Sequence, residues 1–175
     1  MTHNSSITDD RVRCAWAQSD DLMARYHDEE WGKTPGSDNQ YFESLMLEVF
    51  QSGLSWRTIL HRREGFRQAF ARFSIPVVAN YTQHEVERLL EDEKIIRHRG
   101  KIEAAIINAR AFQTIQKQAG SFRDWLQHMP CDDRVIYRAL KPHLKFFGPT
   151  VCISFLQSVG KVTPPHDPDC WLADQ

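Results

Sequence analysis

The chain has 175 residues and a mass of 20.4 kDa, and its 22 Lys plus Arg against 23 Asp plus Glu leave a formal charge of −1 at pH 7. One domain is the expectation for this length, and a hydrophobic share of 41% is too high for a charge-driven disordered chain. The longest uncharged stretch, residues 146–160, is shorter than the roughly 20 apolar residues that a membrane span requires, which excludes a transmembrane protein.

The N-terminal residues lack the apolar core and basic flank of a signal peptide, so we expect a cytoplasmic protein. We expect residues 1–12 to form a flexible N-terminus and residues 13–175 to form a single domain. The 4 cysteines are too few for a disulfide scaffold and are more typical of reduced thiols or metal ligands.

Charge is segregated along the chain. Residues 57–72 and 93–101 are basic, whereas residues 20–30 and 85–93 are acidic. A net charge near zero argues against a protein that coats nucleic acid non-specifically, because such binding depends on neutralising many phosphates. The basic stretches leave two alternatives open, a small local contact with nucleic acid or ordinary solvated helix faces.

The helical period dominates the sequence, and we expect an all-α fold of about six to eight helices. Apolar residues at positions 42, 45, 46, 49 and 50 lie on one face of the first clear helix. Ser37 and Gln40 are spaced as a capping box before it, and Gly53 is placed to end it.

Start and stop signals mark the helices that follow. Thr82 and Glu85 form a second capping-box pattern, and the helix after them is expected to end before Gly100. A third helix is expected from about Lys101 to Gly120. Signals for three later helices are Ser121, Asp132 or Asp133 with Pro142 as stop, and Gly148-Pro149 with Gly160 as stop.

The turn between the second and third helices, residues 95–101, has the pattern of a helix-hairpin-helix. Backbone N–H groups of such a turn can hold a phosphate, and Arg97, Arg99 and Lys101 add positive charge beside Gly100. The alternative is that Gly100 only supplies a positive φ between two ordinary helices.

Two pairs of zinc-type ligands lie near the two ends of the chain. Cys14 and His27 form one pair, and His166 and Cys170 form the other. A closed set of two thiolates and two imidazoles is typical of structural zinc. Because the spacing is not that of a zinc finger, these residues alone favour four unconnected buried, exposed or loop side chains over a metal site.

Aromatic residues gather in the first third of the chain, at Trp16, Tyr26, Trp31 and Trp56. Such rings can stack on a nucleobase, and a cationic base gains cation–π attraction as well. A tryptophan-rich core is the alternative. Glu48 lies off the apolar stripe of its own helix, so periodicity predicts an exposed side chain unless another segment covers it.

Leu54 follows the stop glycine of the first clear helix and is a candidate wedge for a base stack, although a leucine there commonly packs against the helix end.

Several longer motifs occur in chain order: Arg13-Cys14-x-Trp16, Tyr26-His27-Asp28-x-Glu30-Trp31-Gly32, Glu48-x-x-Gln51-x-Gly53-Leu54-Ser55-Trp56, Ile95-Ile96-Arg97-His98-Arg99-Gly100-Lys101-Ile102, Phe146-Phe147-Gly148-Pro149-Thr150 with Ser154-Phe155-Leu156-Gln157, and His166-x-x-x-Cys170. Together, from about Arg13 to Cys170, they resemble the 3-methyladenine DNA glycosylase I family.

The resemblance implies a compact helix-hairpin-helix DNA glycosylase fold in which one structural Zn²⁺ ties the terminal segments together. It implies excision of N3-methyladenine from double-stranded alkylated DNA by base flipping, without strand cleavage, by a protein expected to be a monomer. The residues that match the family's functional positions are Glu48, Tyr26 and Trp56 for the base, with Trp16 and Trp31 completing the pocket; Leu54, Arg97, Arg99, Gly100 and Lys101 for DNA; and Cys14, His27, His166 and Cys170 for zinc.

Two features depart from the family pattern. Pro164-Pro165 stands ahead of His166 where Asn-Asp is usual, and Val49-Phe50 follows Glu48 where some members have Gly and Gln. The first bears on the loop at the zinc site and the second on packing of the pocket. Two rival functions stay open, a non-catalytic zinc-stabilised DNA-binding module and a zinc hydrolase, although four Cys/His ligands leave no open position for the latter.

Overall fold

The computed structural model of the protein describes residues 10–174, so most of the expected flexible segment 1–12 lies outside the described residues. Every regular element between residues 10 and 174 is helical, which confirms the all-α class. That stretch contains ten α-helices and three helical turns of other types, more than the expected six to eight helices. None of its helices combines the length and apolar character needed to cross a bilayer.

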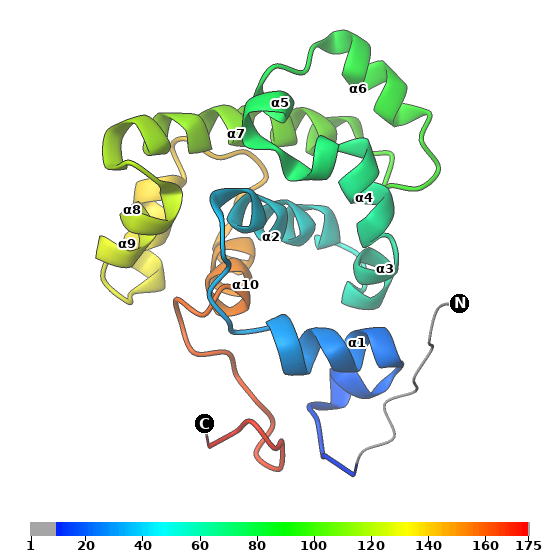
Figure 1. The fold of residues 1–175 in the computed structure, drawn as a ribbon, viewed down its shortest axis with the longest axis vertical. Coiled ribbons are helices and arrows are strands. Elements are labelled where there is room, and N and C mark those ends of the chain that lie inside the picture. The colour runs from blue at the N-terminus through cyan, green and yellow to red at the C-terminus, as the bar shows by residue number, and fades with distance from the viewer. Residues whose placement is uncertain (1–9, 175) are drawn as a thin grey trace.

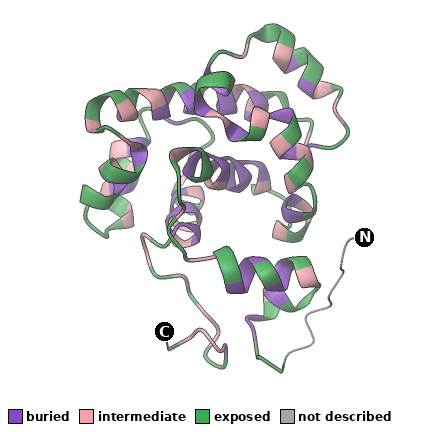
Figure 2. Cartoon of the chain, viewed as in Figure 1, coloured by how far each residue is buried: buried purple, intermediate pink, exposed green. Residues whose placement is uncertain are grey.

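Helix α2 (Asp38–Gln51) lies at the centre of the molecule, below α7 and beside α10 (Figure 1). The expected capping box is present, because Ser37 accepts a hydrogen bond from the Gln40 N–H and the Gln40 side chain accepts one from the Ser37 N–H. Most of α2 is buried along its length (Figure 2), and Gly53, at φ 85°, follows its end.

The second capping box is also confirmed, at Thr82 and Glu85 before α6 (Gln83–Leu90). Helix α7 (Arg99–Ala119) begins two residues earlier than expected, because the His98 side chain caps it by accepting a hydrogen bond from the Lys101 N–H. It ends at Gly120, whose φ of 85° suits only glycine without strain.

The three later helices follow their predicted signals. They are α8 (Phe122–His128) after Ser121, α9 (Asp133–Leu140) after Asp132 and α10 (Pro149–Ser158) after Gly148. Asp132, rather than Asp133, is the N-cap of α9, since its carboxylate accepts hydrogen bonds from the N–H groups of Arg134 and Val135.

The elements that the sequence did not predict are short, and most are too short to show an apolar period of their own. They are η1 (Ala15–Gln18), α1 (Asp21–Arg25), η2 (Tyr26–Glu30), α3 (Trp56–His61), α4 (Arg63–Ala69), η3 (Ala71–Phe73) and α5 (Ile75–Ala79).

The two ends of the described chain lie side by side, below α2 in Figure 1. The Trp171 N–H donates to the Val12 carbonyl at 2.9 Å, and the Ala15 N–H donates to Asp167 Oδ2 at 2.7 Å. This meeting of segments far apart in sequence brings the N-terminal and C-terminal Cys/His pairs together.

Candidate active site and metal centre

The turn η2 positions residues of both parts of the candidate site, an aromatic pocket and a Cys/His cluster. After α1 the backbone widens into the π-helical turn η2, in which the Trp31 N–H donates to the Tyr26 carbonyl at 2.8 Å. Such turns break the regular helical spacing and are frequent at functional sites. Here the adjacent residues Tyr26 and His27 are both buried, the first lining a pocket and the second lying in a Cys/His cluster.

The cluster consists of Cys14, His27, His166 and Cys170, whose ligand atoms all lie within 4.8 Å of one another. His166 Nδ1 is 3.5 Å from Cys14 Sγ and 3.6 Å from Cys170 Sγ, and His27 Nε2 is 3.5 Å from Cys170 Sγ. Tetrahedral zinc, with bonds of about 2.3 Å to sulfur and about 2.1 Å to nitrogen, separates neighbouring ligand atoms by about 3.6 Å. The donor set and its spacing therefore fit zinc.

Groups around the cluster orient the ligands. Asp28 Oδ1 lies 2.8 Å from His27 Nδ1, the carboxylate–imidazole arrangement usual behind a metal-bound histidine. The Asp28 carboxylate also accepts from Arg13 at 2.7 Å and from the Trp171 indole at 3.1 Å. The Asp167 N–H donates to Cys14 Sγ at 3.3 Å. Burial raises the pKa of the Cys14 thiol to about 11, so a cation is needed to hold a thiolate there.

The Pro164-Pro165 departure does not keep His166 out of the cluster. Pro164 lies against Gly32, where an added Cβ would come within 2.7 Å of the proline ring. The Pro164 carbonyl accepts a hydrogen bond from the His166 N–H at 3.1 Å. Glycine at position 32 lets the proline-containing loop pack directly on the turn after η2, with His166 directed at the other ligands.

Beside the cluster lies a pocket of about 220 Å³ between η1, η2, α2, α3 and α10. The Trp16 and Trp31 rings meet edge to face with centroids 5.0 Å apart, and the Tyr26 and Trp56 centroids are 5.1 Å apart. The residues that line the pocket are Trp16, Tyr26, Trp31, Glu48, Gln51, Trp56, Ser154 and Gln157. The structure thus brings the four aromatic residues and Glu48 together.

Glu48 is buried, with 8% of its surface exposed, so of the two alternatives that periodicity left open the covered side chain is the one observed. The periodicity of α2 carries no information about α10, which packs against α2, or about the other segments that line the pocket around Glu48. Burial raises the pKa of the Glu48 carboxyl to about 7. No residue between 10 and 174 donates a hydrogen bond to it, so the carboxylate stays available to a ligand in the pocket.

Trp56 carries a second unpaired group. Its Nε1 is buried and, within the described part of the chain, has no hydrogen-bond partner. Burial also raises the pKa of Tyr26 well above its usual range, with the nearby Glu48 as the next cause. The Tyr26 phenol therefore stays neutral, and the pocket has one titrating group near neutral pH.

The predicted hairpin is formed by α6, residues 91–98 and the first turn of α7. Arg97 is exposed, and Arg99 is about half exposed but paired with Glu87 at 2.9 Å. Gly100 is not at a positive φ, so that explanation for the glycine is wrong. The Phe146 ring lies instead so close that a Cβ on Gly100 would come within 3.0 Å of it.

Lys101 does not present its charge as the sequence suggested. Its side chain is 6% exposed, and its Nζ donates to the Phe50 carbonyl at 3.0 Å and to the Ser52 carbonyl at 2.7 Å. It fastens the start of α7 to the end of α2, beside the turn that carries Leu54. Leu54 is 39% exposed, and the Gln51 side chain donates to its carbonyl at 2.7 Å.

Three pocket residues escaped the sequence reasoning, which gave no role to Gln51, Ser154 or Gln157. A signal was available for the last two, because they stand one helical turn apart as polar residues within the apolar helix α10. Polar groups on one side of an otherwise apolar helix indicate a buried polar surface. Gln51 lies one turn after Glu48 on α2.

Comparison with known proteins supplies the family. Residues 16–142 match the family model described as methyladenine glycosylase. The DNA-3-methyladenine glycosylase 1 of Escherichia coli K12 is 38% identical over 170 residues, covering 86% of this chain and 91% of that protein. The DNA-3-methyladenine glycosylase of Haemophilus influenzae Rd is 34% identical, covering 91% and 96%.

Solved structures agree with the sequence matches. A crystal structure of a 3-methyladenine DNA glycosylase I superimposes with a TM-score of 0.83 at 36% identity, covering 92% of this chain and 99% of the other. A tyrosine-to-phenylalanine variant of such an enzyme, in complex with 3-methyladenine, gives a TM-score of 0.81 at 30% identity over 90% of this chain and 95% of the other.

Proposed function

The chain belongs to the 3-methyladenine DNA glycosylase I family, and we propose that its aromatic pocket carries out that reaction on alkylated DNA. The enzyme hydrolyses the N-glycosidic bond of N3-methyladenine and leaves an abasic site. The observation that carries this assignment is a buried, unpaired Glu48 inside a pocket walled by four aromatic rings.

The chemistry of the leaving group explains why so few catalytic groups suffice. Methylation at N3 gives adenine a positive charge in DNA, so the base departs more easily than a neutral purine. The enzyme has to flip the base out of the DNA helix, and the pocket has to select the base and hold it while water attacks C1′ of the sugar. Gly148-Pro149 is followed by Thr150, so no aspartate stands at the position where many helix-hairpin-helix glycosylases carry one.

Selection of the base falls to Glu48 and the rings. The ionised carboxylate accepts hydrogen bonds from the exocyclic amine of the extruded base and opposes its positive charge in a site with little water. Tyr26 and Trp56 stack against the base, while Trp16 and Trp31 close the pocket, and each such stack contributes about 1–3 kcal/mol.

The hairpin holds the DNA next to the pocket. Backbone N–H groups at the start of α7 and the side chains of Arg97 and Arg99 bind backbone phosphates. Leu54 enters the base stack at the site of the flipped nucleotide. Lys101 acts indirectly, since its buried ammonium group joins the hairpin to the turn that carries Leu54.

Cys14, His27, His166 and Cys170 hold one Zn²⁺ whose role is structural. Four protein ligands fill a tetrahedral site and leave no position for a metal-bound water, so the metal supplies stability by joining the chain ends. The proposed substrate is double-stranded alkylated DNA, on which we expect the protein to act as a monomer.

An excision assay with metal analysis tests the assignment. The purified protein should contain one zinc per chain and release 3-methyladenine from alkylated duplex DNA, leaving abasic sites with the strands intact. Tight DNA binding without release would favour the non-catalytic DNA-binding module. Strand cleavage by the purified protein, without added amine or base, would show a lyase and contradict the monofunctional mechanism.

A further inference from the structure

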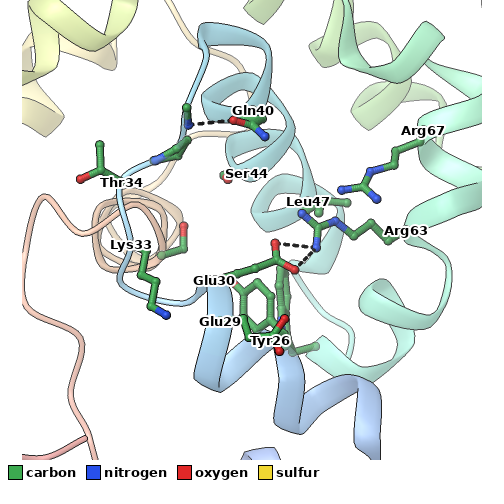
Figure 3. Close-up of a pocket in the computed structure, with 14 residues that line it drawn as sticks. Tyr26, Glu29, Glu30, Lys33, Thr34, Gln40, Ser44, Leu47, Arg63 and Arg67 are labelled. Atoms are coloured by element: carbon green, nitrogen blue, oxygen red, sulfur yellow. Dashed lines mark hydrogen bonds and ion pairs between the residues drawn. The ribbon is translucent and has the colours of Figure 1, made fainter. Parts of the chain in front are cut away.

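A second cavity, of about 350 Å³, lies behind the wall of the base pocket. Tyr26 and Trp56 line both cavities, so their rings form the partition between them. The second cavity is otherwise mostly polar and charged, with Lys33, Ser44 and Arg63 among its lining (Figure 3). Since close packing is what normally fixes a buried ring, Tyr26 needs another restraint on this side.

The structure provides such a restraint at the C-terminal end of the turn η2, where Glu30 forms an ion pair with Arg63. The turn η2 begins at Tyr26 and ends at Glu30, and Figure 3 shows Arg63 reaching from α4 to the Glu30 carboxylate above the Tyr26 ring. Arg63 Nη1 lies 2.9 Å from one Glu30 carboxylate oxygen and 2.8 Å from the other.

The same guanidinium also reaches the central helix. Arg63 Nε donates to Glu43 Oε1 at 2.6 Å, and the Glu43 side chain is only 8% exposed. Arg63 itself is 18% exposed, so its charge is largely shielded from solvent. It joins α4, η2 and α2, and α2 carries the base-recognising Glu48. The neighbouring Arg67 donates to the same Glu43 oxygen at 3.0 Å, with no contact to Glu30.

We propose that Arg63 is a positioning residue for base recognition: by holding Glu30 and Glu43 together, it fixes the turn η2 so that Tyr26 faces Glu48 across the base pocket. This inference rests on the proposed function, because Tyr26 and Glu48 must bind the flipped base for their spacing to matter. A charge-assisted pair of this kind is worth most where solvent is excluded, as at the shielded Arg63–Glu43 contact.

The pair Arg67→Gln and Arg63→Gln provides a matched comparison. Each removes a guanidinium that donates to Glu43, and Arg63→Gln alone also releases Glu30. Affinity for free 3-methyladenine, measured by quenching of tryptophan fluorescence, is expected to fall about 10-fold or more in Arg63→Gln and to change less than about 2-fold in Arg67→Gln. Arg63→Lys should recover only part of the affinity, since one ammonium group cannot span both carboxylates as a guanidinium does.

If Arg63→Gln fails to fold, Glu30→Gln tests the same proposal. The Glu30 side chain is 47% exposed, so its replacement should not prevent folding. This variant is expected to weaken 3-methyladenine binding with bound zinc and affinity for undamaged DNA unchanged. Binding by Arg63→Gln or Glu30→Gln equal to that of the unaltered protein would overturn the proposal. Failure of the unaltered protein itself to bind or release 3-methyladenine would instead overturn the proposed function.

Discussion

Replacing Glu48 with glutamine is expected to stabilise the folded protein above neutral pH while impairing its activity. The Glu48 side chain is almost fully buried, and burial raises its pKa from 4.5 to about 7. Since the folded-state pKa lies above the unfolded value, the native state favours the protonated form. The associated stability is complete below pH 4.5 and is lost as the pH rises through 7.

A pKa raised from 4.5 to about 7 corresponds to about 3 kcal/mol of unfolding free energy lost between those pH values. Glutamine has nearly the same shape and cannot ionise, so Glu48→Gln avoids this loss. Urea unfolding at several pH values should therefore show the variant gaining, relative to the unaltered protein, about 3 kcal/mol between pH 4 and pH 8.

Glu91→Gln is a suitable control, because Glu91 is an exposed glutamate. Its stability relative to the unaltered protein should not vary with pH. Because the variant and the unaltered protein share the Cys/His cluster, any effect of its titration cancels in the difference between their unfolding free energies at each pH. If the difference in unfolding free energy between Glu48→Gln and the unaltered protein does not change from pH 4 to pH 8, the claim that burial raises the pKa of the Glu48 carboxyl is refuted.

Three further outcomes follow from the site. Binding of cationic N3-methyladenine in DNA should strengthen as the pH rises through about 7, where Glu48 ionises, and a pH series with Glu48→Gln should lack this step. Removal of zinc by a chelator should lower the melting temperature, and Cys14→Ser should lose the bound metal measured by mass spectrometry; unchanged values in both would contradict a structural zinc. Lys101→Met should destabilise the protein by roughly 1–3 kcal/mol in urea unfolding, since the buried Phe50 carbonyl and the Ser52 carbonyl lose their donor, and an unchanged midpoint would refute that role.

Local signals in the sequence predicted the longer helices well. The capping boxes at Ser37 and Thr82 form as expected, because both partners of each box lie within four residues. Most of the unpredicted helices span fewer than two turns, and their residues are helical because of tertiary packing. The turn η2 belongs to this class, although it carries Tyr26 and His27.

Residues whose surroundings come from distant segments were the hardest to predict. Glu48 lies in a pocket that is also lined by residues of η1, η2, α3 and α10, and the partners of Lys101 are carbonyls about 50 positions away in sequence. Spacing alone also left the metal cluster open, since His27 and His166 meet only in the fold. The family resemblance pointed to Glu48 and to the four Cys/His residues, because it carries three-dimensional information that periodicity lacks. It placed Lys101 among the DNA contacts, whereas the ammonium group is buried against backbone carbonyls.

The most direct test is single-turnover excision from one alkylated duplex by the unaltered protein and by Glu48→Gln, both checked for bound zinc. Removing a preorganised electrostatic partner of the reacting group typically costs about 10²–10³ in rate. The unaltered protein is expected to release 3-methyladenine, and Glu48→Gln to release it at least about 100-fold more slowly at pH 7.5. Equal rates for the two proteins, or no release by either, would contradict the proposed mechanism.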